Sequence, residues 1–169
     1  MSLILVFRPH QSPAWAAAFP NKQAVVDAFT NDEFAVPLIG APCNGSDWEE
    51  LRAMPTVDEK FSLATEIIGH DLNSLAVLES ADEVFRYINE REYYGQHNKG
   101  IGSVWRQACE LGWVPEYRIA EVEADGSLAD VDNFFAQNDA AAVAKFRESY
   151  DSPDFCLLDP KGGLIPVDA

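Results

Sequence analysis

Residues 56–88, with the sequence TVDEKFSLATEIIGHDLNSLAVLESADEVFRYI, predict a helix, a short strand and a second helix in succession. The first helix has apolar residues at the spacing of one helix face: Val57, Phe61, Ala64, Ile67 and Ile68. Each helix starts at a capping box, in which a hydroxyl and a glutamate three residues later satisfy free backbone amides: Thr56 with Glu59, and Ser80 with Glu83. Between the helices, residues 75–78 form an apolar run of strand length.

The segments on either side repeat this mixture of helices and strands. Further strands are predicted at residues 3–8, 33–39 and 117–123, and a C-terminal hairpin at 155–158 and 164–167. Further helices are predicted at residues 21–29, from 46, and at 101–109, 128–136 and 140–150. We therefore expect a single α+β domain over residues 1–169, in which a mixed sheet of about five or six short strands packs against several amphipathic helices.

The chain carries 28 acidic and 12 basic residues, a formal net charge of −16 at pH 7, and 47% of its residues are hydrophobic. So many apolar residues can form a core, which excludes general disorder. The negative field repels nucleic-acid backbones and attracts cationic proteins. We therefore expect a basic protein partner and no direct nucleic-acid binding, with mimicry of DNA as a special case. A salt-adapted proteome would produce the same acidic surplus without any specific partner.

The sequence also predicts a cytoplasmic protein that does not enter a membrane. Its longest apolar runs, such as residues 3–7, are too short to span a bilayer. That run is followed by Arg8 and Pro9, which does not fit a signal peptide. The cysteines, at positions 43, 109 and 156, are odd in number and widely spaced, as expected for reduced thiols. We expect no cofactor, and the oligomeric state stays open.

Residues 116–139 hold seven acids and one base, Arg118. The alternation predicts a strand with three residues facing inward (Ala120, Val122 and Ala124) and the acids between them facing outward. Like-charged neighbours on one strand face repel each other and favour a cationic partner. The predicted partner-binding residues are Glu121, Glu123, Asp125, Asp130 and Asp132, with the aromatic Trp113 nearby. Ser127 with Asp130 would then cap the helix predicted at 128–136.

A calcium-responsive module is one alternative for the same segment. Residues 121–132 place acids and a glycine as in an EF-hand loop, with Glu121, Glu123, Asp125 and Asp132 as candidate metal ligands. The two glutamates are longer than the aspartates that this loop requires, and a strand replaces the entering helix. The pattern therefore favours a strand and turn over a metal site.

A thiol-dependent hydrolase or transferase is the other alternative, with Cys43 as nucleophile and His97, or else His10, as base. Nothing in their spacing requires the two side chains to meet. Near His97, the loop residues Lys99, Gly100 and Gly102 precede a helix and form a weak candidate for anion binding. It matches neither the P-loop nor the dinucleotide-binding pattern.

The sequence favours a non-catalytic protein over an enzyme, because none of its motifs specifies a catalytic set. We expect an acidic cytoplasmic protein that binds a basic protein, with inhibition of that partner as one form of the function, as in inhibitor and immunity proteins. The thiol enzyme and the calcium module stay open as alternatives, and the order of the strands is not determined.

Overall fold

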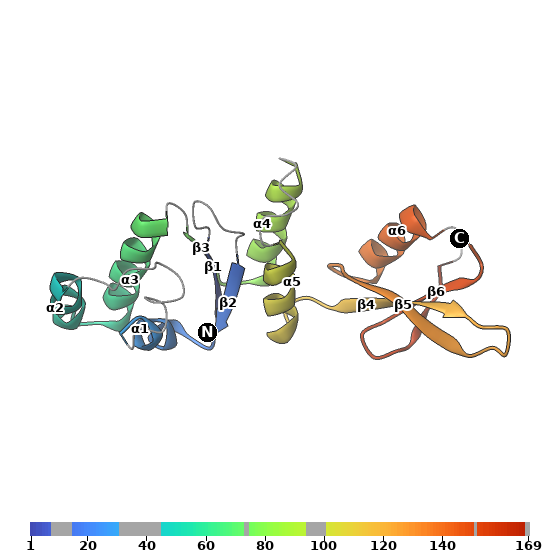
Figure 1. Ribbon diagram of the computed structural model, residues 1–169, viewed down its shortest axis with the longest axis horizontal. Coiled ribbons are helices and arrows are strands. Elements are labelled where there is room, and N and C mark those ends of the chain that lie inside the picture. The colour runs from blue at the N-terminus through green and yellow to red at the C-terminus, as the bar shows by residue number, and fades with distance from the viewer. Residues whose placement is uncertain (8–14, 31–44, 73–74, 94–100, 151, 168–169) are drawn as a thin grey trace. The chain divides into compact units, whose positions relative to one another are not determined.

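The computed structural model describes residues 1–7, 15–30, 45–72, 75–93, 101–150 and 152–167. These residues form six helices and seven strands in two antiparallel sheets, which confirms the α+β class (Figure 1). The strands do not form the one mixed sheet that was expected. Contacts divide the chain into two compact units, Met1–Leu111 and Gly112–Ala169, each with a sheet of its own. We call them the N-terminal unit and the C-terminal unit.

The sheet of the N-terminal unit has β1 (Leu3–Phe7) between β2 (Trp15–Phe19) and β3 (Leu75–Leu78). All five residues of β1 are buried, as expected for a central strand covered on both faces. Strand β2 was not predicted, because its sequence WAAAF has no alternation of polar and apolar residues. The strand predicted at residues 33–39 lies outside the described residues.

Five helices cover the two faces of this sheet: α1 (Lys22–Thr30), α2 (Gly45–Ala53), α3 (Val57–Leu72), α4 (Ala81–Tyr93) and α5 (Ile101–Glu110). Leu3, Leu5 and Phe7 point from β1 into a core shared with α1, α2 and α3. Because strand side chains alternate, Ile4 and Val6 point to the opposite face, next to α4 and α5. Figure 1 shows the two groups of helices on opposite sides of the strands.

The predicted capping residues hold the helix starts in place. The Thr56 hydroxyl donates to the Glu59 carboxylate at 2.6 Å, and this carboxylate also accepts the Thr56 backbone N–H at 3.1 Å. The Glu59 N–H returns to the Thr56 hydroxyl at 3.2 Å, which completes the capping box before α3. At α4, the Ser80 hydroxyl accepts the Glu83 N–H at 3.3 Å. None of the helices in the described part of the chain is long and apolar enough to cross a bilayer.

The sheet of the C-terminal unit has the order β5-β4-β6-β7. Its strands are β4 (Glu116–Val122), β5 (Leu128–Phe135), β6 (Phe155–Leu158) and β7 (Leu164–Ile165). Helix α6 (Asp139–Ser149) packs on one face of the sheet, where Ala142 and Phe146 contact Tyr117, Ile119 and Leu157. The helix predicted at 140–150 and the C-terminal hairpin are both confirmed. In the turn of that hairpin, the Asp159 carboxylate accepts the backbone N–H groups of Lys161 and Gly163.

The helix predicted at residues 128–136 is wrong, because this segment forms strand β5. The preceding residues make a tight turn in which the Gly126 N–H donates to the Glu123 carbonyl at 2.8 Å. The Glu123 N–H in turn donates to the Ser127 carbonyl at 2.9 Å, and Gly126 has a φ of 83°. This is a three-residue hairpin turn, and it returns the chain along β4. Backbone pairing with β4 outweighs the local resemblance of Ser127 and Asp130 to a helix cap.

Candidate partner-binding surface

A β-bulge in β5 splits the predicted row of carboxylates between the two faces of the sheet. Ile119 of β4 pairs with Asp132, whereas the next residue, Ala120, pairs with Asp130. Val131 is therefore an extra residue without a partner across the ladder. Without the bulge, Asp130 and Asp132 would share a face. With it, Asp132 lies on the face of α6, together with Ile119, and Asp130 lies on the opposite face.

Asp132 ties β5 to the end of α6. Its Oδ2 accepts a hydrogen bond from the Tyr150 hydroxyl at 3.0 Å, and its Oδ1 accepts the backbone N–H of Asn133 at 2.8 Å. The hydrogen bond to Asp132, burial and the charge of Asp132 together raise the pKa of Tyr150. This carboxylate therefore already has two partners within the fold, which makes it a poor candidate for contact with another protein.

A second tyrosine–aspartate pair ties β4 to the start of α6. The Tyr117 side chain is 2% exposed, and its hydroxyl donates to Asp139 Oδ1 at 2.8 Å. Burial, followed by the hydrogen bond to Asp139, raises the pKa of Tyr117 to about 12. Together with the Tyr150–Asp132 bond, this contact holds both ends of the helix to the sheet.

Asp130 is paired with the base Arg118 on the other face. Its Oδ2 lies 3.1 Å from Arg118 Nη1, and both side chains are exposed. Arg118 also lies close to the turn between β6 and β7, where a Cβ added to Gly162 would come within 3.0 Å of its Nη2. The charge of Asp130 is therefore offset by a neighbouring guanidinium.

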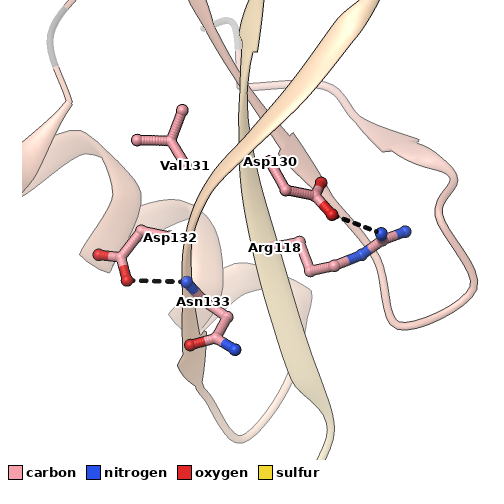
Figure 2. A pocket seen from close by; sticks show the side chains of 5 residues that line it. All are labelled: Arg118, Asp130, Val131, Asp132 and Asn133. Atoms are coloured by element: carbon pink, nitrogen blue, oxygen red, sulfur yellow. Dashed lines mark hydrogen bonds and ion pairs between the residues drawn. The ribbon is translucent and has the colours of Figure 1, made fainter.

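An open depression of about 290 Å³ lies at the bulge. Five residues line it: Arg118, Asp130, Val131, Asp132 and Asn133. Figure 2 shows the Arg118–Asp130 pair on one side of β5 and Asp132, next to the Asn133 amide, on the other. The lining contains no thiol, hydroxyl or imidazole group. It therefore has no nucleophile or histidine base, and each of its two carboxylates is bonded to a group of the fold itself.

The turn between β4 and β5 carries the carboxylates that stay exposed. Asp125 Oδ1 accepts hydrogen bonds from the Ser127 hydroxyl at 2.6 Å and from the Ser127 N–H at 2.9 Å, and these lower the pKa of Asp125. The side chains of Glu121 and Glu123 are exposed and make no hydrogen bond or ion pair with the described residues. A fourth acid, Asp154, is exposed beside them, because its carbonyl accepts the Val122 N–H at 2.7 Å.

Two aliphatic side chains are exposed on the face of the hairpin opposite to Glu121 and Glu123. Val122 and Leu128 pair directly across the hairpin, and their exposed fractions are 43% and 46%. Val122 was expected to face inward, but α6 covers only the opposite face of this hairpin. We name these six residues the hairpin surface: Glu121, Val122, Glu123, Asp125, Leu128 and Asp154. Val122, Leu128 and Asp154 were not predicted as site residues. Alternation alone assigns an aliphatic strand residue such as Val122 to the core, and Leu128 was expected to start a helix.

Trp113 lies at the other end of β4 from the hairpin surface. It precedes the strand by three residues and is half-buried. Because a strand advances about 3.3 Å per residue, the seven residues of β4 place Trp113 roughly 20 Å from the turn. It is therefore not an anchor for Glu121, Glu123 or Asp125.

The residues of the alternative sites are described only in part. Cys43, His10, His97, Lys99 and Gly100 lie outside the described residues. Gly102 is exposed in the first turn of α5. The other two thiols are half-buried, and Cys156 donates to the Ala120 carbonyl at a sulfur–oxygen distance of 3.5 Å. The thiol pair and the anion loop therefore stay predictions, because their residues, apart from Gly102, lie outside the described part of the chain.

The candidate calcium loop is a β-hairpin. Asp125 bonds to its own turn, and Asp132 lies beyond the bulge next to Tyr150. Across the described ranges, no group of three or more histidine, cysteine, aspartate or glutamate side chains is placed to hold a metal ion. Residues 121–132 thus lack the helix–loop–helix geometry of an EF-hand.

Comparison of the chain with family models, with curated proteins and with solved structures found no match.

Proposed function

We propose that the C-terminal unit binds a basic protein through the hairpin surface and that it acts by binding rather than by catalysis. The observation that carries this proposal is the exposed end of the hairpin, where the Val122–Leu128 pair lies on one face, Glu121 and Glu123 lie on the other, and none of the six residues is a base. Protein interfaces combine a desolvated apolar centre with a polar rim. Here the rim is anionic, which selects a cationic partner.

The distribution of charge over the chain supports the same choice of surface. The C-terminal unit has 12 acids and 4 bases in 58 residues, a net charge of −8. The N-terminal unit has 16 acids and 8 bases, also −8, spread over 111 residues. The acidic surplus per residue is thus about twice as high in the C-terminal unit. Such a field raises the rate at which a cationic partner is encountered.

The acids of this region differ in whether they are bonded within the fold, and this decides which of them belong to the hairpin surface. Asp130 and Asp132 are bonded to Arg118 and Tyr150, so we exclude them from the binding surface. Glu121 and Glu123 have no such bonds and are the main candidates for salt bridges with the partner. A second copy of this chain would be repelled by the same charges, so we propose a different, basic protein, met in the cytoplasm.

The test compares two variants with equal loss of charge. Glu121→Gln/Glu123→Gln/Asp125→Asn removes three of the four charges of the hairpin surface, and asparagine still accepts the Ser127 N–H. Glu49→Gln/Glu50→Gln/Glu148→Gln removes three exposed charges from α2 and α6. Each protein is used as bait in a lysate of its own source at about 50 mM NaCl, and the proteins that about 500 mM NaCl releases are identified. The captured partner is then purified, and its affinity for each variant is measured by calorimetry.

We expect the hairpin variant to bind the purified partner roughly tenfold more weakly than the control variant. A third variant, Val122→Ser/Leu128→Ser, should also lose roughly tenfold in affinity while keeping its salt dependence, because it removes the apolar centre but no charge. Equal binding by the hairpin and control variants would reject the surface. Capture of no basic protein by the wild-type chain would reject the function itself.

A further inference from the structure

Helix α5 satisfies the outer edge of strand β2 through two side chains. Strand β2 forms one edge of the N-terminal sheet, because its partner within the sheet is β1. The Ala16 N–H donates to the Ser103 hydroxyl at 2.8 Å, and this hydroxyl lies 3.4 Å from the Ala16 carbonyl, to which it donates in turn. The Ala18 N–H donates to Gln107 Oε1 at 2.7 Å. Three of the four outward backbone groups of Ala16 and Ala18 are thus bonded to side chains of α5.

The spacing of the two side chains along α5 matches the spacing of the outward N–H groups along β2. Ser103 and Gln107 are four residues apart on α5, a rise of about 6 Å along the helix. Ala16 and Ala18 are two residues apart on β2, about 6.7 Å along the strand. The helix is fixed at this distance by Ile101, Val104 and Ala108, which are buried. Polar side chains at helical spacing therefore take the place of a neighbouring strand, and we name Ser103 and Gln107 the edge lock.

The strand under the edge lock has none of the usual protection against pairing. Exposed edges are normally guarded by charged residues, proline or a bulge. The sequence of β2, WAAAF, has no charge and no proline, and its register with β1 has no bulge. The edge therefore depends on α5 for its protection.

The sequence of β2 is also suited to pairing with itself. In an antiparallel pair centred on Ala17, Ala16 of one copy faces Ala18 of the other. These residues carry the outward N–H groups, so four backbone hydrogen bonds would form across the pair. The ends of the two strands would also meet in register, with residue 15 of one copy opposite residue 19 of the other.

We infer that α5 is a removable lock on β2, and that release of Ser103 and Gln107 lets β2 pair with β2 of a second copy of this chain. The inference concerns the N-terminal unit and does not depend on the proposed function of the C-terminal unit. It describes a conformational switch, in which one edge is either bound to α5 or bound to another molecule.

The test removes the two acceptors and keeps the shape of α5. Ser103→Ala/Gln107→Met is the unlocked variant, and Gly102→Ala/Arg106→Ala changes the exposed side of the same helix as a control. Amide exchange of Ala16 and Ala18 is measured by mass spectrometry, and mass is measured by sedimentation from about 10 to 500 μM in about 0.5 M NaCl, which screens the repulsion between copies. We expect exchange roughly tenfold faster and a dimer that grows with concentration in the unlocked variant alone.

Two further variants show whether β2 is the pairing element. Ala18→Pro in the unlocked chain removes an outward N–H without removing a bond to β1, so the dimer should be lost. Ser103→Thr/Gln107→Glu keeps both acceptors and should stay monomeric. A monomeric unlocked variant at every concentration, or a dimer that survives Ala18→Pro, would overturn the inference. If the double variant does not fold, Gln107→Met alone is judged by the same outcomes.

Discussion

Aspartates of the same short segment have different roles, which their neighbours decide. Asp125 bonds to its own turn, Asp130 pairs with Arg118, and Asp132 accepts the hydroxyl of Tyr150. The sequence shows only that these three aspartates lie in one acidic segment, and it does not distinguish their roles. Only the contacts of each carboxylate separate those that hold the fold together from those that are available to a partner.

The buried Tyr117 hydroxyl predicts a loss of stability at alkaline pH. Its pKa is about 12 in the folded protein and about 10 in an unfolded chain, so folding favours the neutral hydroxyl. This contribution to stability is complete below pH 10 and is lost as the pH rises from about 10 to about 12. Tyr117→Phe should lower the free energy of unfolding at pH 8 by about 1 kcal/mol, because the bond to Asp139 is lost.

Urea unfolding at several pH values between 8 and 12 measures both effects. The variant should show a smaller alkaline decline than the wild-type protein, and the tyrosinate absorbance step near pH 12 should be absent. An unchanged alkaline decline in Tyr117→Phe would show that this hydroxyl does not set the high-pH limit.

At the scale of elements, helices were predicted more accurately than strands. The capping box before α3 makes the hydrogen bonds that the sequence implied. Before α4, the Glu83 N–H donates to the Ser80 hydroxyl as expected, whereas the Glu83 carboxylate accepts the N–H of Glu79 and not that of Ser80. Strand β2 was missed and β5 was predicted as a helix. A helix bonds to itself within four residues, whereas a strand depends on a partner elsewhere in the chain, so its pattern alone is ambiguous.

Two threonines of the α3 region should respond in opposite ways to the same substitution. Thr56→Ala removes the cap that accepts the Glu59 N–H and should lower the free energy of unfolding by about 1 kcal/mol. Thr65 lies inside the helix, and its hydroxyl donates to the Phe61 carbonyl at 2.9 Å. Thr65→Ala should be neutral or slightly stabilising, because alanine has the higher helix propensity.

Urea unfolding measures the change in unfolding free energy for each variant. This change follows from the shift of the midpoint, provided that the dependence of the free energy on urea concentration is the same in all proteins. Similar losses for the two threonine variants would mean that the capping box does not stabilise the helix start.

At the scale of the whole molecule, the negative charge opposes folding. The net charge is −16, and half of it is carried by the smaller C-terminal unit. Exposed like charges repel each other in the compact state, and this repulsion weakens as salt shortens the screening length. The same carboxylates that we propose for binding a basic partner therefore reduce the stability of the unbound protein.

Added sodium chloride should accordingly raise the melting temperature. Between about 10 and 500 mM NaCl the screening length falls from about 30 Å to a few ångströms, and we expect Tm to rise by a few degrees. The triple variant Glu121→Gln/Glu123→Gln/Asp125→Asn has a net charge of −13. Its melting temperature at low salt should be higher than that of the wild-type protein, and it should rise less when salt is added. Differential scanning calorimetry in a chloride series measures this, and chloride is used because sulfate stabilises by a different route. A flat or falling Tm would exclude charge repulsion as a main cost of the fold.

The sequence by itself determined the α+β class, the starts of α3 and α4 and the turn of the C-terminal hairpin. Each of these depends on residues within about four positions of one another, such as Thr56 with Glu59 or Asp159 with Gly163. The tertiary structure alone decided that the strands divide into two sheets, that residues 128–135 form a strand, and that Val122 is exposed. It also decided that Asp130 and Asp132 face opposite sides of the sheet. These features depend on pairing between distant segments and on a one-residue bulge, and neither is encoded in the periodicity of a single stretch of chain.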